Sequence, residues 1–328
     1  MRFITTFFLT VVFLTSALYG LIMAVDPYNK FGYNLFGFET KAVDFARVNK
    51  FNQVEFSKKE YTGFITGSSS AHRYETAALK RLTGLEFYNY STQSATPEDY
   101  LAMTRHFLKR NKHLKMVILS MDYEVLNKNV KTDEMFYASP LKNYLNEVPE
   151  DEKKIDLFNN SYFTLAAIQD SFKVIWVNLF GEARHSYLAD GNYKRETPDA
   201  KELKIIQFNG GAYELSEKRV EYLKTIKAIC DEHGIKLIVF TSPISYGHLE
   251  LVRSTPAAAR GQNIFKKALL DTFGEFYDFQ NEGIKKYNSL EFFGNSNHPS
   301  HDFSNAVMGR IFGQPDPANP EFGRLIKR

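Results

Sequence analysis

The chain has 328 residues, of which 44% are apolar and 24% charged, and its 41 basic and 38 acidic residues leave a formal net charge of +3. This is ordinary globular usage, and it excludes a disordered chain, a fibrous repeat and a membrane protein with many spans. The near balance of charge gives no reason to expect nucleic acid as a partner. The single Cys, Cys230, excludes an internal disulfide and a cysteine-based zinc site, and we expect it to be a small, buried apolar residue on a helix face.

A long apolar segment lies at the N-terminus. No charged residue occurs between Arg2 and Asp26, and about 20 apolar residues in a helix are enough to span the hydrocarbon core of a membrane. A cleaved signal peptide has a shorter apolar core and a small-residue cleavage site, whereas this segment ends in Met-Ala-Val-Asp-Pro. We therefore expect residues 1–25 to be an uncleaved transmembrane signal-anchor. A cleaved signal peptide and a buried core helix are the alternatives.

Flanking charges and domain size point to opposite topologies. Lys30, Lys41 and Arg47 follow the segment and only Arg2 precedes it, which by the positive-inside rule would place the C-terminal side in the cytoplasm. Large C-terminal domains, however, are translocated largely regardless of such charges. We expect a single-pass cell-membrane protein with an extracytoplasmic C-terminal domain, on the periplasmic or extracellular face.

Strand and helix patterns alternate after an aromatic and basic juxtamembrane segment at residues 26–58. β-rich apolar runs that predict strands lie at 61–66, 85–90, 116–121 and 235–241. Helical patterns follow the first run up to Arg81, begin at Pro97 after the N-cap Thr96, and cover residues 217–233. The alternation predicts an α/β domain at 59–328, built on a doubly wound, mostly parallel sheet.

Residues 145–213 interrupt this alternation. They contain a predicted helical pair at 162–179 and a polar loop through Asp190, Gly191 and Asn192. We interpret the segment as an insertion of the kind that covers a ligand crevice at the carboxyl ends of strands.

The polar residues at the carboxyl ends of the predicted strands suggest a catalytic site. Four predicted strand ends are informative, at 67–70, 89–91, 120–122 and 241–243, and each carries at least one hydroxyl group. Ser69 stands between a strand and a helix, where backbone N–H groups can stabilise an oxyanion and a nearby His can take the hydroxyl proton. His298 lies in the densest polar cluster, just before the last predicted helix. Ser69 with His298 is therefore the candidate site, and the alternative is that residues 68–70 only cap a helix.

Four short blocks resemble those of SGNH (GDSL-type) hydrolases: ITGSS at 65–69, FYNYSTQS at 87–94, VILSMD at 117–122 and GNSNH at 294–298. With an N-terminal anchor before them, the layout is most similar to membrane-anchored SGNH-like proteins that accompany O-acyltransferases of bacterial surface polysaccharides. Alginate O-acetylation proteins and the D-alanyl transfer protein of teichoic acid are of this kind. The resemblance implies a three-layer α/β/α, SGNH/flavodoxin-like fold without a cofactor. It also implies a cell-envelope location, a surface polysaccharide or acyl donor as substrate, and a membrane O-acyltransferase as partner.

Carried over by position, the resemblance implies that Ser69 is the nucleophile and His298 its general base. The acid of the family, three residues before the His, is here Asn295. An amide can orient an imidazole but cannot stabilise the imidazolium by charge, and the same Asp-to-Asn change in the serine-protease triad lowers turnover by about 10⁴.

Three further positions belong to the implied oxyanion and substrate site. The glycine of the second block falls at Ser94, whose N–H could still serve an oxyanion, and Asn89 ends the strand before it. Asp122 matches the asparagine of the third block only loosely. A carboxylate there would repel an oxyanion, but Asp122 could take over the orienting role that Asn295 leaves.

Two alternatives concern the histidines. His301 lies three residues after His298 and is the alternative base; we prefer His298 because its spacing to the end of the last predicted helix matches the family. A metal bound by His298, His301 and Asp302 would need a further spaced His or Glu cluster that the sequence lacks, so we expect no metal site.

The tyrosines near the candidate site also allow two interpretations. Tyr74, Tyr88 and Tyr90 could stack on sugar rings, although aromatic runs are more often part of a core.

Three functional hypotheses follow. The first is an O-acyltransferase or esterase that forms an acyl-enzyme on Ser69. The second is a catalytically degenerate adaptor or glycan-binding subunit of a membrane O-acyltransferase. The third is an anchored α/β domain without acyl chemistry.

Overall fold

The computed structural model describes residues 2–29, 31, 35–38, 46–145, 164–181, 188, 190–192, 213–289, 291–295, 297–313 and 316–328. The chain divides into two compact units. The first comprises residues 1–58, 148–189 and 193–195, and the second comprises residues 59–147, 190–192 and 196–328. Most of the segment between 145 and 189 thus groups with the N-terminal part of the chain.

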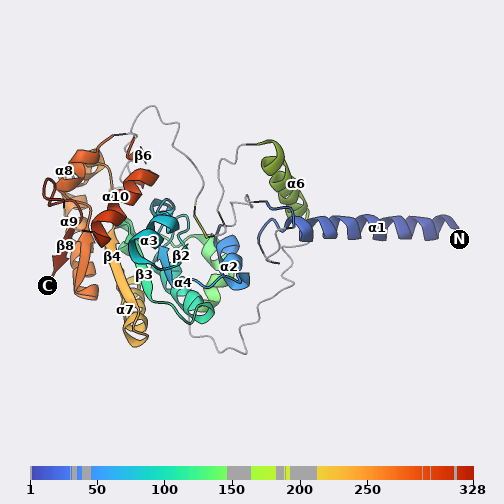
Figure 1. Cartoon of the computed structure of the whole chain (residues 1–328), viewed down its shortest axis with the longest axis horizontal. Helices are drawn as coiled ribbons and strands as arrows, with labels where there is room; N and C mark the ends of the chain where they lie inside the picture. Colours follow the sequence, from blue (N-terminus) through green and yellow to red (C-terminus); the bar gives the residue numbers. More distant parts are fainter. Residues whose placement is uncertain are drawn as a thin grey trace. The chain divides into compact units, whose positions relative to one another are not determined.

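Among its described residues, the first unit contains the helices α1 (Arg2–Val25), α2 (Ala46–Phe56) and α6 (Leu165–Phe180). The 24 residues of α1 are long and apolar enough to cross a membrane, which suits a membrane anchor (Figure 1). Asp26 ends α1 in the left-handed region at φ 47°, and Pro27 cannot continue the helix.

The predicted helical pair at 162–179 is wrong within the described residues. The structure has one continuous helix, α6, at Leu165–Phe180, and residues 162 and 163 lie outside the described part. No Gly or Pro occurs between 165 and 180, so nothing in the sequence breaks the helix.

A six-stranded sheet organises the second unit. In sheet order its strands are β2 (Phe87–Asn89), β1 (Gly63–Thr66), β3 (Met116–Met121), β4 (Lys236–Thr241), β5 (Glu275–Asp278) and β8 (Arg324–Lys327). The first five are parallel, and only the edge strand β8 is antiparallel, to β5. The expectation of an α/β fold with a mostly parallel sheet and an apolar N-terminal helix is confirmed. The strands β5 and β8 were not predicted from the sequence.

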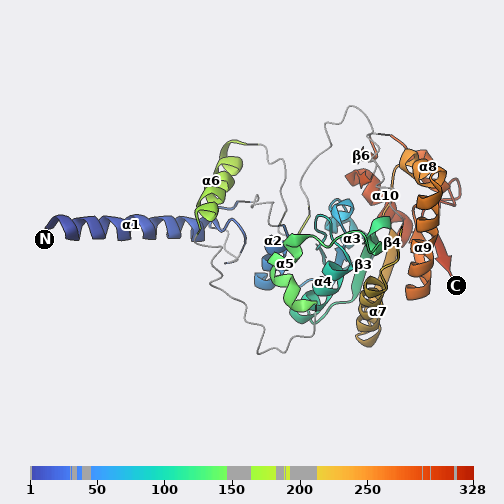
Figure 2. The ribbon, with the colours of Figure 1, turned by 180° about the vertical axis from the view of Figure 1, so that it is seen from behind.

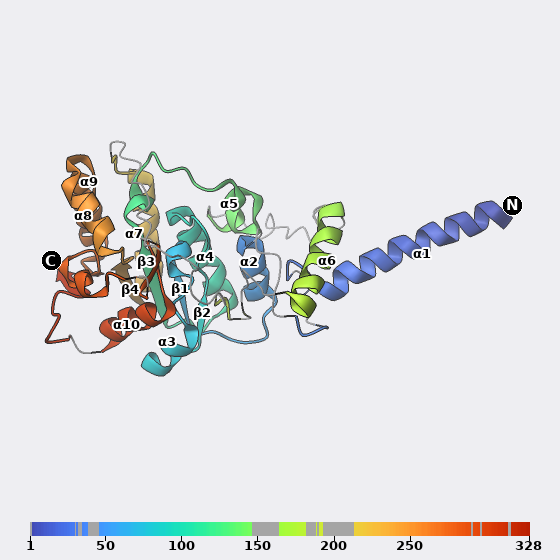
Figure 3. The same ribbon diagram turned by 90° about the horizontal axis from the view of Figure 1, so that it is seen from above.

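Helices pack against both faces of this sheet, which explains its continuous apolar strands. Successive residues of β1 point to opposite faces. Phe64 packs on Phe107 of α4 (Pro97–Arg110), with ring centroids 4.6 Å apart, whereas Ile65 joins a core cluster with Leu79 of α3 (Thr76–Thr83) and Val307 of α10 (His301–Phe312). Figure 3 shows α3 and α10 on one side of the strands and α7 (Glu217–Glu232) on the other.

The remaining elements are short or lie near the C-terminal end. They are α5 (Glu134–Ala138), α8 (Tyr246–Ser254), α9 (Pro256–Phe273), the two-stranded pair β6 (Phe293–Asn295) and β7 (His298–Pro299), and 3₁₀ turns at Ser69–Ala71, Tyr123–Leu126, Pro140–Tyr144 and Glu282–Tyr287. Figure 2 shows α8 and α9 side by side near the C-terminus.

The tyrosines proposed as sugar platforms are core residues. Tyr74, Tyr88 and Tyr90 are each 0% exposed, so none of these rings can stack on a substrate. Tyr88 and Tyr90 pack edge to face, with centroids 5.5 Å apart. Cys230 is buried as expected, and burial raises the pKa of its thiol to about 12, so that the thiol stays protonated and unreactive.

A buried ion pair joins the starts of two helices. Arg219 of α7 is 4% exposed and Glu98 of α4 is 7% exposed. The Arg219 Nε donates to both Glu98 carboxylate oxygens, at 3.2 and 3.3 Å. Its two Nη groups donate to the carbonyls of Val125 (3.0 Å), Asn127 (2.9 Å) and Val130 (2.8 Å). One guanidinium thereby fixes α4, α7 and the loop after β3.

We expect Arg219→Met to lower the free energy of unfolding by about 3–5 kcal/mol, because it leaves the Glu98 carboxylate buried without its cation. Lys224→Met is the matched control, since Lys224 pairs with Glu221 at the exposed surface and should change stability by about 0–1 kcal/mol. Denaturant unfolding of the full chain in detergent, followed by near-UV circular dichroism, measures both values. Equal losses in the two variants would contradict this role of Arg219.

Candidate active site

The chain turns sharply where β1 ends, and this turn presents Ser69. A Cβ on Gly67 would lie 2.8 Å from the Cβ of Ala71 and 2.9 Å from the Cβ of Ser120, so only glycine fits there. The Ser68 Oγ accepts a hydrogen bond from the Ser70 N–H at 3.2 Å and caps the 3₁₀ turn. Ser69 is left partly exposed at the carboxyl edge of the sheet.

The structure brings the two principal candidate residues together. The Ser69 Oγ lies 2.8 Å from the His298 Nε2, although 229 residues separate them in the chain. His298 begins β7 and is partly exposed, as Ser69 is. A hydroxyl within hydrogen-bond distance of an imidazole nitrogen is the arrangement that a serine nucleophile and its general base require.

The surroundings of His298 favour its neutral form. Burial lowers the pKa of the imidazole, and the positive charge of Arg73 lowers it further, whereas the negative charge of Asp122 opposes both effects. Arg73 also donates from Nη1 to the carbonyl of Pro299 at 3.0 Å, which fixes the residue next to His298. A neutral imidazole at pH 7 can accept a proton from Ser69.

Asp122 is connected to the Ser69 turn through hydroxyl groups. The Ser70 Oγ donates to the Asp122 Oδ1 at 2.8 Å. Ser70 also lies 3.2 Å from the Ser242 Oγ, which is 2.8 Å from the Ser120 Oγ. The carboxyl ends of β1, β3 and β4 thus converge, and they place the Asp122 carboxylate near His298.

The side chain of Asn89 fixes the Ser69 turn by hydrogen bonds to its main chain. Its Nδ2 donates to the carbonyls of Ala71 (3.0 Å), His72 (3.3 Å) and Tyr74 (3.1 Å). Its Oδ1 accepts from both the N–H and the hydroxyl of Ser91, at 3.1 and 2.5 Å. Asn89 is 0% exposed, so its amide positions the Ser69 turn and does not face a substrate.

Ser94 adopts a backbone conformation that suits glycine better than serine. Its φ is +49°, in the left-handed region, and the residue is exposed. The Thr92 N–H donates to the Gly67 carbonyl at 3.2 Å, so the loop that leads to Ser94 passes beside the Ser69 turn. Within the described part of the chain, the N–H groups of Ser69 and Ser94 have no protein acceptor and remain open to a ligand.

The remaining two candidates have different surroundings. Asn295 lies opposite His298 in the β6–β7 pair, and the contacts of its side chain fall outside the described part of the structure. The His301 Nδ1 lies 3.5 Å from the Glu75 Oε1, whereas it is His298 whose ring contacts the Ser69 hydroxyl.

A short piece of the interrupting segment, residues 190–192, docks beside β2. The Asp190 carbonyl accepts from the Asn89 N–H at 2.8 Å, and the Asp190 carboxylate accepts from the Thr76 hydroxyl at 2.5 Å. The Asn192 Oδ1 accepts from the Thr76 N–H at 3.3 Å and so caps α3. Gly191 has a φ of +78°, and a Cβ there would lie 2.2 Å from the Asn89 carbonyl oxygen. The polar loop is therefore fitted closely to the strand end that supports Ser69.

Three contributors were not identified as site residues from the sequence: Arg73, Ser70 and Ser242. The serines carried a weak signal, since each follows a predicted strand. Arg73 carried none beyond its nearness to Ser69 in the chain, because it acts on a carbonyl and an imidazole that are distant in sequence.

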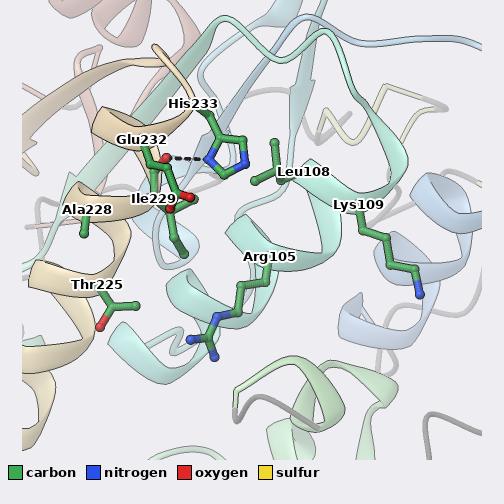
Figure 4. Close-up of a pocket in the computed structure, with 8 residues that line it drawn as sticks. All are labelled: Arg105, Leu108, Lys109, Thr225, Ala228, Ile229, Glu232 and His233. Carbon is green, nitrogen blue, oxygen red and sulfur yellow. Dashed lines mark hydrogen bonds between the residues drawn. The ribbon is translucent and has the colours of Figure 1, made fainter. Parts of the chain in front are cut away.

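Other potential sites lie elsewhere. No group of three or more His, Cys, Asp or Glu side chains within the described ranges could hold a metal ion. A cavity of about 480 Å³ lies between the C-terminal ends of α4 and α7, and Arg105, Lys109, Glu232 and His233 are among its lining residues (Figure 4). Because β3 and β4 follow these helix ends, the cavity is at the amino edge of the sheet, opposite to Ser69.

A scan against protein-family models finds no match to this chain, and a search of the curated proteins finds no similar sequence.

Proposed function

We propose that this chain is a membrane-anchored SGNH-like enzyme that transfers or hydrolyses O-acyl groups of a cell-surface glycan through Ser69. The contact of 2.8 Å between the Ser69 Oγ and the His298 Nε2, at the carboxyl edge of a parallel sheet, is the observation that carries the proposal. The strand order also supports it. Ser69 follows β1 and Asp122 follows β3, and the order reverses between these two strands, where open α/β sheets bind their ligands.

The proposed reaction has two steps. In the first, the Ser69 Oγ attacks the carbonyl carbon of an O-acyl ester while the His298 Nε2 takes the hydroxyl proton. The tetrahedral oxyanion accepts hydrogen bonds from open backbone N–H groups such as those of Ser69 and Ser94. The intermediate then breaks its bond to the leaving alcohol, which receives the proton from His298, and an acyl-Ser69 ester remains. In the second step His298 activates water or a glycan hydroxyl to attack that ester, which restores Ser69.

Asp122 supplies the negative charge that the family places at the position of Asn295. Its charge raises the proton affinity of His298, and its link to the Ser69 turn through Ser70 fixes its position. An imidazolium that forms during the reaction is therefore stabilised by a carboxylate from the end of β3. Ser70 satisfies one of the Asp122 oxygens and keeps that carboxylate in place.

The location and partners belong to the same proposal. With α1 as a single-pass anchor, the α/β unit works on the extracytoplasmic face of a bacterial cell membrane as a three-layer, SGNH/flavodoxin-like domain. Its substrate is a surface polysaccharide or an acyl donor, and a membrane O-acyltransferase is its partner.

A second candidate is a non-catalytic adaptor that presents glycan to such a transferase. The Asn at position 295 favours it, because an amide there removes the usual partner charge of the base. A reagent that reacts only with an activated serine separates the two candidates.

We expect a fluorophosphonate probe to label the full chain at Ser69, and Ser69→Ala to abolish the labelling. His298→Ala should slow it by about 10²–10⁴-fold, because the general base is lost. Ser254→Ala is the control, since Ser254 is an exposed serine of α8 without a neighbouring imidazole among its hydrogen bonds, and labelling should not change. Absence of labelling in the folded wild-type chain would favour the adaptor.

The labelling rate should also depend on pH in a way that identifies His298. The rate falls as His298 becomes protonated, and because its pKa is lowered, the midpoint should lie below about 6.5. Asp122→Asn removes a charge that raises this pKa, so the midpoint should move to lower pH. Arg73→Met removes a charge that lowers it, so the midpoint should move to higher pH. Arg81→Met, on the exposed surface of α3, should leave the midpoint unchanged; equal shifts in all three variants would contradict the assignment.

A further inference from the structure

On α6 the distribution of apolar side chains is the reverse of that on a helix in a soluble protein. The large apolar side chains of α6 are exposed and its buried side chains are small: Ala167, Ser171 and Val174 face inward. The exposed residues are Leu165 (70%), Phe172 (55%), Trp176 (65%), Leu179 (60%) and Phe180 (72%). Large side chains outside and small ones at the helix contact are typical of helices that face lipid.

The exposed residues form a single stripe. At about 100° per residue, positions 165, 172, 176 and 179 lie on one face, opposite the buried positions 167, 171 and 174. Gln169 is the polar member of this face, and the rings of Trp176 and Phe180 pack at 5.0 Å. The stripe runs the length of the helix and is broad enough to contact a flat apolar surface.

Contacts within the first unit fix α6 to the C-terminal end of α1. Ala167 and Ile168 pack with Ile22 and Tyr28, and the Tyr28 hydroxyl donates to the Asp170 Oδ2 at 2.6 Å. About 20 residues of α1 fill the hydrocarbon core, so Ile22 and Tyr28 lie near its C-terminal surface. Figure 1, Figure 2 and Figure 3 all show α6 crossing the direction of α1. A helix that is attached to the end of a spanning helix and crosses its direction is placed to run along the membrane surface.

We propose that α6 lies in the plane of the membrane interface and inserts this apolar stripe among the lipid acyl chains. The chain then contacts the membrane at two places, the spanning helix α1 and the surface helix α6. The inference rests on the proposed role of α1 as a single-pass anchor, but it does not depend on the chemistry of Ser69.

Length, charge and aromatic content favour the interface over a second span. The 16 residues of α6 extend about 24 Å, less than the hydrocarbon thickness of about 30 Å, and they include Asp170 and Lys173. Trp and other aromatic residues are enriched at the level of the lipid headgroups. An interfacial helix inserts its apolar face by about 5–10 Å, a depth that the side chains of Phe172 and Trp176 can reach.

The single Trp of the chain, Trp176, makes the test direct. The full chain is reconstituted in phosphatidylcholine and phosphatidylglycerol vesicles that carry bromine on either the upper or the terminal acyl carbons. We expect Trp176 fluorescence to be quenched at least about twofold more strongly by upper than by terminal bromines, and to be protected from aqueous acrylamide.

A double variant supplies the control. In Trp176→Phe with Ile264→Trp, the only Trp moves to an exposed position of α9 in the second unit, where acrylamide should quench it and brominated lipid should not. In Phe172→Ser with Leu179→Ser, two members of the stripe are polar, and bromine quenching of Trp176 should fall. Quenching of wild-type Trp176 by acrylamide but not by bromine would show that this face lies in water in the vesicles, and it would overturn the proposal in favour of a protein partner that binds there.

Discussion

The amide of Asn89 imposes the constraint on which the candidate site depends. It donates to the carbonyls of Ala71, His72 and Tyr74, and so fixes the main chain that leaves the Ser69 turn. In this stretch the chain makes one 3₁₀ turn at 69–71 and begins α3 only at residue 76. Because the amide is buried, its bonds are not weakened by competition with water, and the turn is held rigidly from within the sheet.

Rigidity at this turn matters because its partners come from distant parts of the chain. His298 arrives through the β6–β7 pair, and Asp122 arrives at the end of β3. If the turn moved by an ångström or two, His298 would lose its contact with Ser69 and Asp122 would lose its hydrogen bond from Ser70, since both distances are 2.8 Å. The tight fit of Gly67 against Ser120 adds a steric limit to the hydrogen-bonded one. Residues at the carboxyl ends of β1, β2 and β3 thus fix the position of Ser69 together.

The features that could be predicted from the sequence are those with local causes. The run at 116–121 is apolar except for Ser120 and forms β3 over the same residues. Thr96-Pro97 opens α4 because its cap chemistry acts within one turn. The strands β5 and β8 were not predicted, because each has only two apolar residues between charged ends, and β8 is stabilised by pairing with β5 alone. Ser69 and His298 could be paired from turn chemistry and resemblance. The roles of Asn89 and Arg73 could not, since both bind main-chain carbonyls whose positions only the tertiary structure sets.

The aromatic residues show why composition alone cannot distinguish the two units. The chain has 29 Phe and 19 Tyr, and in the α/β unit rings such as Phe64 and Tyr88 are fully buried between sheet and helices. On α6 the same kind of side chain is exposed, as at Phe172 and Trp176. Transfer of an aromatic ring out of water is favourable in either place. A bilayer can supply the apolar surroundings that a protein core supplies elsewhere. The proposed placement of α6 at the membrane surface gives its exposed rings apolar surroundings outside the protein, and the attachment of α6 to the end of α1 is the reason for choosing the bilayer.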